Sequence, residues 1–236
     1  MAEVKTFERS TDHVENQLIR AVLDGDYPPG SFLPPERELA SKLGVARPTL
    51  REALRRLERD GWFTVRKGLP TVVNDVWRQG NLNTLANIVQ NTGHFTGNFT
   101  IYLLEVRSAL APSFFREAVA RNPVKVVAAL ADCDGLDDSA DAYSAFDWRL
   151  QKTLAHLSGN PIYLLILNSF DHVYIRLAEQ YFSMEENRRK SRRFYEQLLS
   201  AAMAMDPAAA GRVTREAMEE SISLWKKSPL SQRPRL

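Results

Sequence analysis

Several protein classes are excluded by what the sequence lacks. Cys133 is the single cysteine among 236 residues, which rules out a disulfide framework and a thiolate metal cluster. No apolar run approaches the ~20 residues of a membrane-spanning helix, and the first residues lack the apolar core of a signal peptide. Histidine is also scarce, with four in the chain. We therefore expect a cytoplasmic protein without a membrane partner.

The composition is that of a folded protein whose positive charge is concentrated in one stretch. Hydrophobic residues make up 44% of the chain and charged residues 25%, and the length suits one or two domains. The net charge is only +2, yet the segment from Arg47 to Lys67 has seven Lys or Arg residues against three acidic ones. A charge run is usually a solvated helix face, so its meaning depends on the predicted structure around it.

Two short amphipathic segments meet at a glycine within Leu33–Gly61. The first follows Pro34-Pro35, where a helix can begin, and Gly44 can adopt the positive φ that ends it. The small side chain of Ala40 allows two helices to cross closely, as in a helix-turn-helix. The second segment has one apolar face, formed by Val45, Leu50, Ala53, Leu54 and Leu57.

The outer face of the second segment carries Arg47, Arg51 and Arg55, each four residues apart. A short helix with a guanidinium at every turn, placed second in such a pair, is suited to a DNA major groove. After it, Trp62–Arg66 and Thr71–Val73 have strand character on either side of a turn. This predicts a β-hairpin, and therefore a winged helix-turn-helix whose hairpin tip contacts phosphates or the minor groove.

The rest of the chain has a helical pattern. No β pattern interrupts residues 82–227, which predicts an all-α bundle after the α/β winged helix-turn-helix. Within the bundle, one helix is expected from Pro161 to Phe182, Ser183 and Glu186 have the spacing of a capping box, and Asp206-Pro207 begins the last helix. The expected organisation is a DNA-binding domain over 1–75, a linker over 76–81, an effector-binding and dimerisation domain over 82–228, and a flexible tail over 229–236.

Long motifs resemble those of a known family. The runs P-P-G-S-F-L-P-P-E-R-E-L-A (28–40), L-G-V-A-R-P-T-L-R-E-A-L (43–54) and R-D-G-W (59–62) are similar to those of the GntR-type winged-helix regulators. In the second half, A-H-L-S-G-N-P-I-Y-L-L-I-L-N (155–168) resembles the FadR, or fatty-acid-metabolism, branch of that family. The resemblance extends from about residue 7 to residue 227.

The resemblance implies which residues read DNA. Arg47 and Arg51 can each fork to guanine O6 and N7, a contact that gives ~1–3 kcal/mol of discrimination. Two departures from the family pattern stand beside them: Ala46 lacks the hydroxyl that relatives often have there, and Pro48 has no backbone N–H. We expect an intact fold with an altered operator preference. The full implied set is Arg37, Arg47, Thr49, Arg51, Lys67 and Gly68.

Three other basic residues have two interpretations. Arg55, Arg56 and Arg59 lie on or near the same helix as the implied readers. They could contact DNA, or they could form a solvated face or interdomain ion pairs.

The second domain lacks the metal ligands of many relatives, which have an Asp-x-x-x-His helix and two later histidines. The aspartate is present as Asp147, but Gln151 stands four residues after it. The two later positions are occupied by Tyr195 and Ser221. With all three imidazoles missing, we predict no metal site.

Loss of these ligands is typical of the branch that responds to acyl-CoA. Its pocket residues correspond to Arg107, Tyr181, Tyr195, Ser221 and Trp225. The resemblance implies that Arg107 faces the CoA phosphates, that the tyrosines line the acyl chain and that Trp225 stacks near CoA. An aromatic at helical spacing ordinarily belongs to the core, so both interpretations stay open for the tyrosines. Met218 stands where the family has glycine, which implies a shorter, displaced or more weakly bound ligand.

The function implied is a homodimeric transcription regulator of fatty-acid metabolism that binds a palindromic operator in double-stranded DNA. Long-chain acyl-CoA in the bundle would relieve operator binding by a protein that represses degradation genes, with activation of biosynthesis genes left open. The alternative is a GntR-type regulator of a small carboxylate or sugar acid. No cofactor is expected, and no phosphate-binding glycine loop, nucleophile elbow or Lys-centred signature indicates an enzyme.

Overall fold

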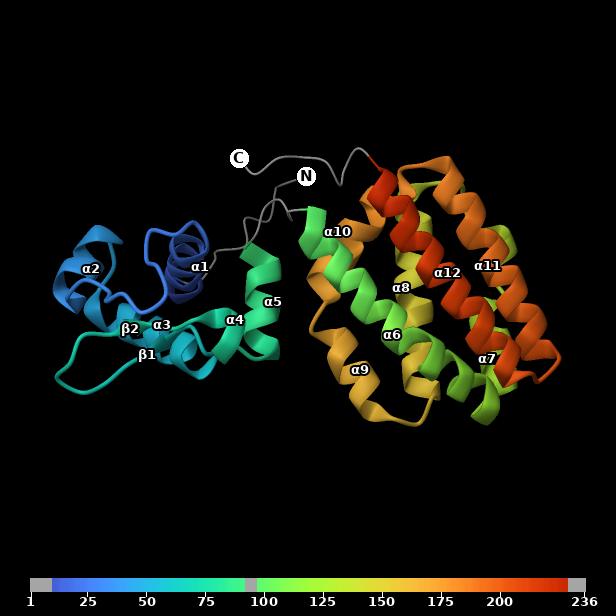
Figure 1. Cartoon of the computed structure of the whole chain (residues 1–236), viewed down its shortest axis with the longest axis horizontal. Helices are drawn as coiled ribbons and strands as arrows, with labels where there is room; N and C mark the ends of the chain where they lie inside the picture. Colours follow the sequence, from blue (N-terminus) through green and yellow to red (C-terminus); the bar gives the residue numbers. More distant parts are fainter. Residues whose placement is uncertain (1–9, 92–96, 229–236) are drawn as a thin grey trace, which may run out of the picture. The chain divides into compact units, whose positions relative to one another are not determined.

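The computed structural model describes residues 10–91 and 97–228, without the side chains of residues 97, 98, 172 and 173. The chain divides into two compact units, Met1–Gly93 and His94–Leu236 (Figure 1). Over the described residues, no helix combines the length and the hydropathy that a bilayer crossing requires.

The first unit contains the predicted helix-turn-helix. Gly44, at φ 67°, lies between its two helices, and Leu39 and Ala40 of the first helix are buried beneath the second. The second helix buries four of the five predicted stripe residues, Leu50, Ala53, Leu54 and Leu57, whereas Val45 precedes the helix and is half-buried. The elements of the unit are α1 (Ser10–Leu23), α2 (Glu36–Lys42), α3 (Arg47–Arg59), β1 (Phe63–Thr64), β2 (Val72–Val73), α4 (Val76–Gln79) and α5 (Leu82–Asn91).

The hairpin is also present. Strands β1 and β2 pair antiparallel, with Phe63 opposite Val73, and Phe32 adds a bridge to Val72. Gly68 in the connecting loop has φ 77°, a conformation that favours glycine. The α/β winged helix-turn-helix predicted for this part of the chain is confirmed.

The predicted linker over 76–81 is folded. It contains α4, and the side chain of Asn81 accepts the backbone N–H of Thr84 in the first turn of α5. The buried carboxylate of Asp60, which ends α3, accepts hydrogen bonds from the amides of Asn83 and Asn87 on α5. These bonds hold α5 against the winged helix, so the division of the chain falls at Gly93 rather than at residues 76–81.

Over its described residues the second unit consists of helices and the turns that connect them, without a strand, as predicted. Its helices are α6 (Gly97–Arg121), α7 (Pro123–Leu130), the 3₁₀ turn η1 (Cys133–Gly135), α8 (Ala140–Leu157), α9 (Pro161–Asn168), α10 (Asp171–Phe182), α11 (Glu185–Met203) and α12 (Pro207–Lys227).

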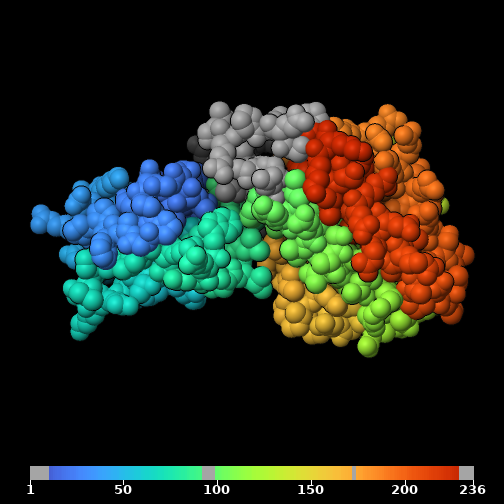
Figure 2. Space-filling view, in the orientation of Figure 1, coloured from blue at the N-terminus to red at the C-terminus, as the bar shows by residue number. Residues whose placement is uncertain are grey.

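The core of this unit is aromatic. Helix α6 lies along α12, and α11 follows on the other side of α12, so their surfaces adjoin on one face (Figure 2). Beneath them Phe114, Phe115, Phe146 and Tyr195 are at most 2% exposed. The rings of Phe146 and Tyr195 meet edge to face at 4.9 Å. Burying each such side chain stabilises the folded state by roughly 1.5–3 kcal/mol. The contact between Phe146 and Tyr195 fixes how α8 meets α11.

Two expectations about helix ends were wrong, and one is confirmed. The helix expected from Pro161 to Phe182 is broken between α9 and α10, at Ser169 and Phe170. The capping box expected at Ser183 does not form, because α11 begins after Met184 and the Ser183 hydroxyl donates to a carbonyl of the preceding helix. Asp206 does cap α12, since its carboxylate accepts the N–H of Ala209 at 2.8 Å.

Candidate functional sites

The first candidate site is the exposed face of α3. The side chains of Arg47 and Arg51 are 56% and 55% exposed, and both lie close to the carboxylate of Glu36 at the start of α2. Arg51 donates its Nε–H to Glu36 Oε2 at 2.8 Å, whereas Arg47 Nη2 lies at 3.6 Å from the same oxygen. The carboxylate thus restricts the rotamers of two arginines that the resemblance assigns to base reading.

The start of α3 shows the consequence of the two departures from the family pattern. Ala46 occupies the N-cap position with an extended backbone and no side-chain hydrogen bond to the helix. Pro48 lies in the first turn, where a missing N–H is tolerated. Thr49 is half-buried at the same end of the helix. The helix forms as expected, but its first turn has free N–H groups that a phosphate could bind.

The other residues implied to contact DNA are exposed, and the three arginines with two interpretations differ in their environments. Arg37 is exposed in the first turn of α2, and Lys67 and Gly68 are exposed in the hairpin loop. In contrast, Arg56 and Arg59 belong to ion pairs within this unit. Arg56 contacts Asp12, Glu15 and Glu52, and Arg59 contacts Asp60; Arg55 is exposed.

Arg56 and Arg59 therefore have structural partners, which favours the ion-pair interpretation for these two residues, within the first unit rather than between domains. The pKa of Arg56 is raised mainly by its hydrogen bond to Glu52, and the pKa of Arg59 is raised mainly by its hydrogen bond to Asp60.

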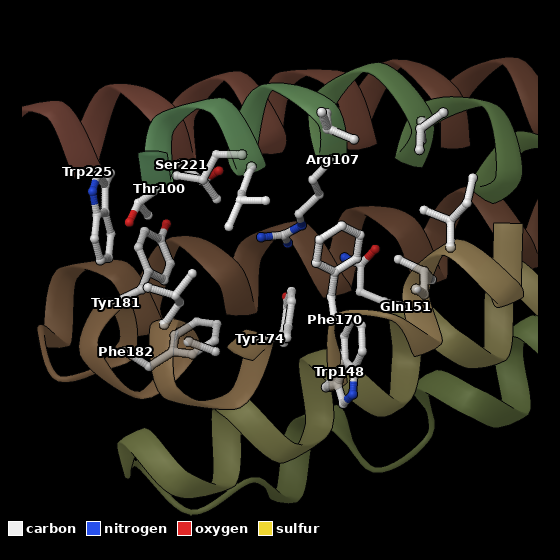
Figure 3. A pocket seen from close by; sticks show the side chains of 18 of the residues that line it. Thr100, Arg107, Trp148, Gln151, Phe170, Tyr174, Tyr181, Phe182, Ser221 and Trp225 are labelled. Carbon is white, nitrogen blue, oxygen red and sulfur yellow. The ribbon is translucent and has the colours of Figure 1, made fainter. Parts of the chain in front are cut away.

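The second candidate site is a cavity of about 100 Å³ inside the bundle. It is lined by side chains of α6, α8, α9, α10 and α12, most of them aliphatic or aromatic. Figure 3 shows Arg107 entering it from α6 between two groups of aromatic side chains. Polar side chains in its wall are few, namely Thr100, Arg107, Gln151 and Ser221, together with the polar edges of Trp148, Tyr174, Tyr181 and Trp225.

A buried polar network stands behind the cavity, centred on Asp147 of α8. Its carboxylate, 3% exposed, lies 3.3 Å from Nη2 of Arg107 and accepts the hydroxyl of Tyr195 at 2.9 Å. The hydroxyl of Tyr174 donates to the same carboxylate. Four helices, α6, α8, α10 and α11, therefore meet at one charged group.

The electrostatics of the network agree with these roles. Burial raises the pKa of Tyr174 and Tyr195 well above the usual value, and the charge of Asp147 adds to it, so both phenols remain protonated donors. Burial alone would lower the pKa of Arg107, but the oxygens of Tyr174 and Asp147 outweigh it and raise that pKa. The network is thus a buried ion pair with two neutral donors.

Four of the five residues predicted for the effector line the cavity, and one does not. Arg107, Tyr181, Ser221 and Trp225 are in its wall. Tyr195 is fully buried behind it and holds Asp147 instead.

Met218 lies on α12 one turn before Ser221, is 2% exposed and belongs to the core. Together with Lys190 and Glu220 it lines a smaller, more polar cavity that adjoins Arg107 and Tyr181 on the other side. Met218 therefore fills space next to the predicted ligand residues, as its departure from the family pattern suggested.

Several lining residues were missed by sequence reasoning. Tyr174 stacks on Trp148 with ring centroids 4.1 Å apart, and Phe170 at the break between α9 and α10 completes this wall. Only the aromatic spacing signalled them, and that spacing is equally typical of a core. The family pattern marks Gln151 only as the replacement of a metal ligand. Over the described residues, no group of three or more His, Cys, Asp or Glu side chains could hold a metal ion.

Comparisons with known proteins also divide the chain in two, but they do so before α4 and α5 rather than at Gly93. Residues 10–73 match the model of the bacterial regulatory proteins of the gntR family, and residues 74–232 match the FadR C-terminal domain. The chain is 43% identical over 189 residues to the fatty acid metabolism regulator protein of Shewanella pealeana, covering 80% of this chain and 79% of that one.

Further relatives extend the match. The fatty acid metabolism regulator protein of Shewanella frigidimarina is 39% identical over 213 residues, covering 90% and 89% of the two chains. Among solved structures, Lar, which controls the expression of the Listeria monocytogenes agr system, aligns with a TM-score of 0.63 at 16% identity, over 94% of this chain and 99% of that one. The last likeness concerns the fold alone. The chain belongs to the GntR family of bacterial transcription regulators, and its second part is a FadR C-terminal domain.

Proposed function

We propose that this protein is a DNA-binding transcription regulator of fatty-acid metabolism whose operator binding is relieved by long-chain acyl-CoA. The names of its relatives support the first half of the proposal. The observation that carries the second half is the apolar cavity of the bundle, entered by one arginine and connected through it to a buried network joining four helices. A DNA target also implies action in the cytoplasm.

The DNA arm of the proposal rests on the exposed start of α3. Arg47, Thr49 and Arg51 read the DNA from the start of the helix, with Thr49 able to bond a base edge or a phosphate, while Arg37 and the loop residues Lys67 and Gly68 contact the backbone or the minor groove. Two copies would place two such helices in successive major grooves of a palindromic site. We therefore include a homodimer in the proposal, which sedimentation of the purified protein tests directly.

The effector arm rests on the size and the lining of the cavity. A void of about 150 Å³ holds one benzene molecule, so a cavity of about 100 Å³ cannot contain a long acyl chain without enlargement. Because its wall is shared by five helices, enlargement must displace some of them. The ligand would thereby favour a second arrangement of the bundle, with leverage limited to its differential affinity for the two states.

The proposal is tested by an electrophoretic mobility shift with an operator selected from a random duplex library. Addition of oleoyl-CoA at micromolar concentrations should release the DNA, while coenzyme A alone should leave the complex intact. A complex that keeps its mobility with oleoyl-CoA well above micromolar levels refutes the effector assignment. Reporter fusions to degradation and biosynthesis genes then distinguish a repressor of the first set from a regulator that also activates the second.

The alternative effectors are a small carboxylate or a sugar acid. A sugar acid needs a partner for every hydroxyl, and the lining of this cavity is mostly apolar. A carboxylate would have to compete with Asp147 for Arg107. A thermal-shift screen with acyl-CoAs, carboxylates and sugar acids distinguishes the classes, because stabilisation grows with the ratio of ligand concentration to Kd.

A further inference from the structure

One polar side chain in the wall of the bundle cavity has no structural task. Gln151 lies on α8 one turn after Asp147 and is 1% exposed. Neither its Oε1 nor its Nε2 has a hydrogen-bond partner among the described residues. The same residue lines the cavity (Figure 3). Buried amides are normally satisfied on both atoms, so a partner from outside the protein, bound in the cavity, would complete its hydrogen bonds.

Unsatisfied polar atoms gather at this cavity. Over the described residues, seven buried side-chain nitrogen or oxygen atoms lack a hydrogen-bond partner. Four of them belong to residues that line the cavity: both amide atoms of Gln151, Nε of Arg107 and Nε1 of Trp225. Three of these four atoms are donors, so the cavity as a whole is complementary to oxygen acceptors.

The unsatisfied atoms are also separated along the cavity. In Figure 3 Gln151 and Trp225 lie on opposite sides of Arg107. In that view Phe170 and Trp148 lie at the same end of the cavity as Gln151. A single carbonyl oxygen of a ligand cannot bond both Gln151 and Trp225. A ligand that extends through the cavity therefore meets one donor near Trp225 and a second polar group, with both donor and acceptor, at Gln151.

A plain hydrocarbon chain is poorly matched to this second group. It would fill the apolar part of the cavity but leave both amide atoms of Gln151 without partners in a low-dielectric wall. A hydroxyl can donate one hydrogen bond to Oε1 of Gln151 and accept another from its Nε2. A leucine or a phenylalanine at position 151 would suit an unsubstituted chain better.

We propose that Gln151 is a specificity-determining residue that selects an acyl chain bearing a hydroxyl group over the unsubstituted chain. This inference rests on the proposed function, because it assumes an acyl ligand in the cavity. It assigns the class of effector as a hydroxylated long-chain acyl thioester, with its thioester carbonyl and its chain oxygen at different ends of the cavity.

The experiment is isothermal titration of the full chain with hexadecanoyl-CoA and with three forms that carry one hydroxyl, on the third, the tenth or the terminal carbon. At least one hydroxylated form should bind about tenfold more tightly than the unsubstituted one, a ratio that corresponds to about 1.4 kcal/mol. Gln151→Met, which keeps the length of the side chain, should abolish that preference and increase affinity for hexadecanoyl-CoA. Gln151→Leu provides a second apolar variant should the first fail to fold.

Thr153→Val is the matched control, because Thr153 lies on the same helix but outside the cavity wall. It should preserve the wild-type preference. Equal affinity for all four ligands in the wild type, or an unchanged preference in the Gln151 variants, overturns this inference and leaves the proposed function standing. If none of the four acyl-CoAs binds, the proposed function itself fails.

Discussion

Replacing Arg107 by methionine removes the only positive charge bonded to the buried carboxylate of Asp147 among the described residues. The side chain of Arg107 is 20% exposed and that of Asp147 3%, so water replaces little of the lost interaction. Breaking a buried pair by deleting one partner costs roughly 3–5 kcal/mol. Because Tyr174 and Tyr195 still donate to the carboxylate, we expect the low end, about 3 kcal/mol.

Urea unfolding measures this cost. With an m-value of about 2–3 kcal/mol/M, a loss of about 3 kcal/mol lowers the midpoint by roughly 1–1.5 M. Arg116→Met is the matched control, since Arg116 lies on the same helix and pairs with Glu117 at the surface, where 55% and 36% of the two side chains are exposed. Exposed pairs contribute about 0–1 kcal/mol, so the control should shift the midpoint by less than about 0.5 M.

A double variant tests the cause. Asp147→Asn in the Arg107→Met background removes the uncompensated charge while leaving an acceptor for the two phenols, so it should recover at least half of the lost stability. If Arg107→Met costs no more than Arg116→Met, or if the double variant is no more stable than the single one, the ion pair is not what holds the four helices at this point.

Three further predictions concern other parts of the molecule. Ala46→Ser supplies the missing N-cap of α3 and should raise the unfolding free energy of the first unit by about 0.5–2 kcal/mol in urea titrations. In fluorescence anisotropy, Arg47→Ala should lose ~1–3 kcal/mol of binding free energy on the operator and discriminate less between bases at the contacted position. Lys67→Ala should weaken binding to all sequences and reduce the slope of log affinity against log salt concentration by about 1. The raised pKa of Tyr195 means that above about pH 10 the unfolded chain loses a proton that the folded one retains. Stability should therefore fall as the pH rises, and Tyr195→Phe should remove up to about 1.4 kcal/mol per pH unit of that slope.

The elements that the sequence predicted well are those with local causes. Gly44 at positive φ, the proline pair before α2 and the apolar stripe of α3 act within a few residues, so the helix-turn-helix follows from short-range rules. The same holds for the starts of α9 and α12, where Asn160 and Asp206 cap helices that begin with proline.

The elements that were missed have distant causes. The break between α9 and α10 is not marked by glycine or proline, and apolar periodicity continues through it. The start of α10 is instead fixed by Asp171, whose carboxylate accepts bonds from Trp148 Nε1 at 2.6 Å and Lys152 Nζ at 2.7 Å on α8. The placement of α5 after residues 76–81 depends similarly on Asp60 at the end of α3, whose carboxylate accepts bonds from Asn83 and Asn87. No local pattern contains either contact.

The difference between local and distant causes also limits what the sequence predicts of the cavity in the bundle. Sequence patterns can place Tyr181 and Tyr195 on helices, but whether a tyrosine faces a cavity or a carboxylate depends on how α8, α10 and α11 cross. The structure separates the two: Tyr181 lines the cavity, and Tyr195 holds Asp147. Arg107 takes part in both, since its Nη2 contacts Asp147 while its Nε remains unpaired in the cavity wall. A ligand oxygen bonded to Arg107 would therefore compete with, or reorient, the contact that joins α6 to α8. Filling the cavity and altering the network are thus coupled through one side chain, which gives an effector a physical route to the arrangement of the bundle.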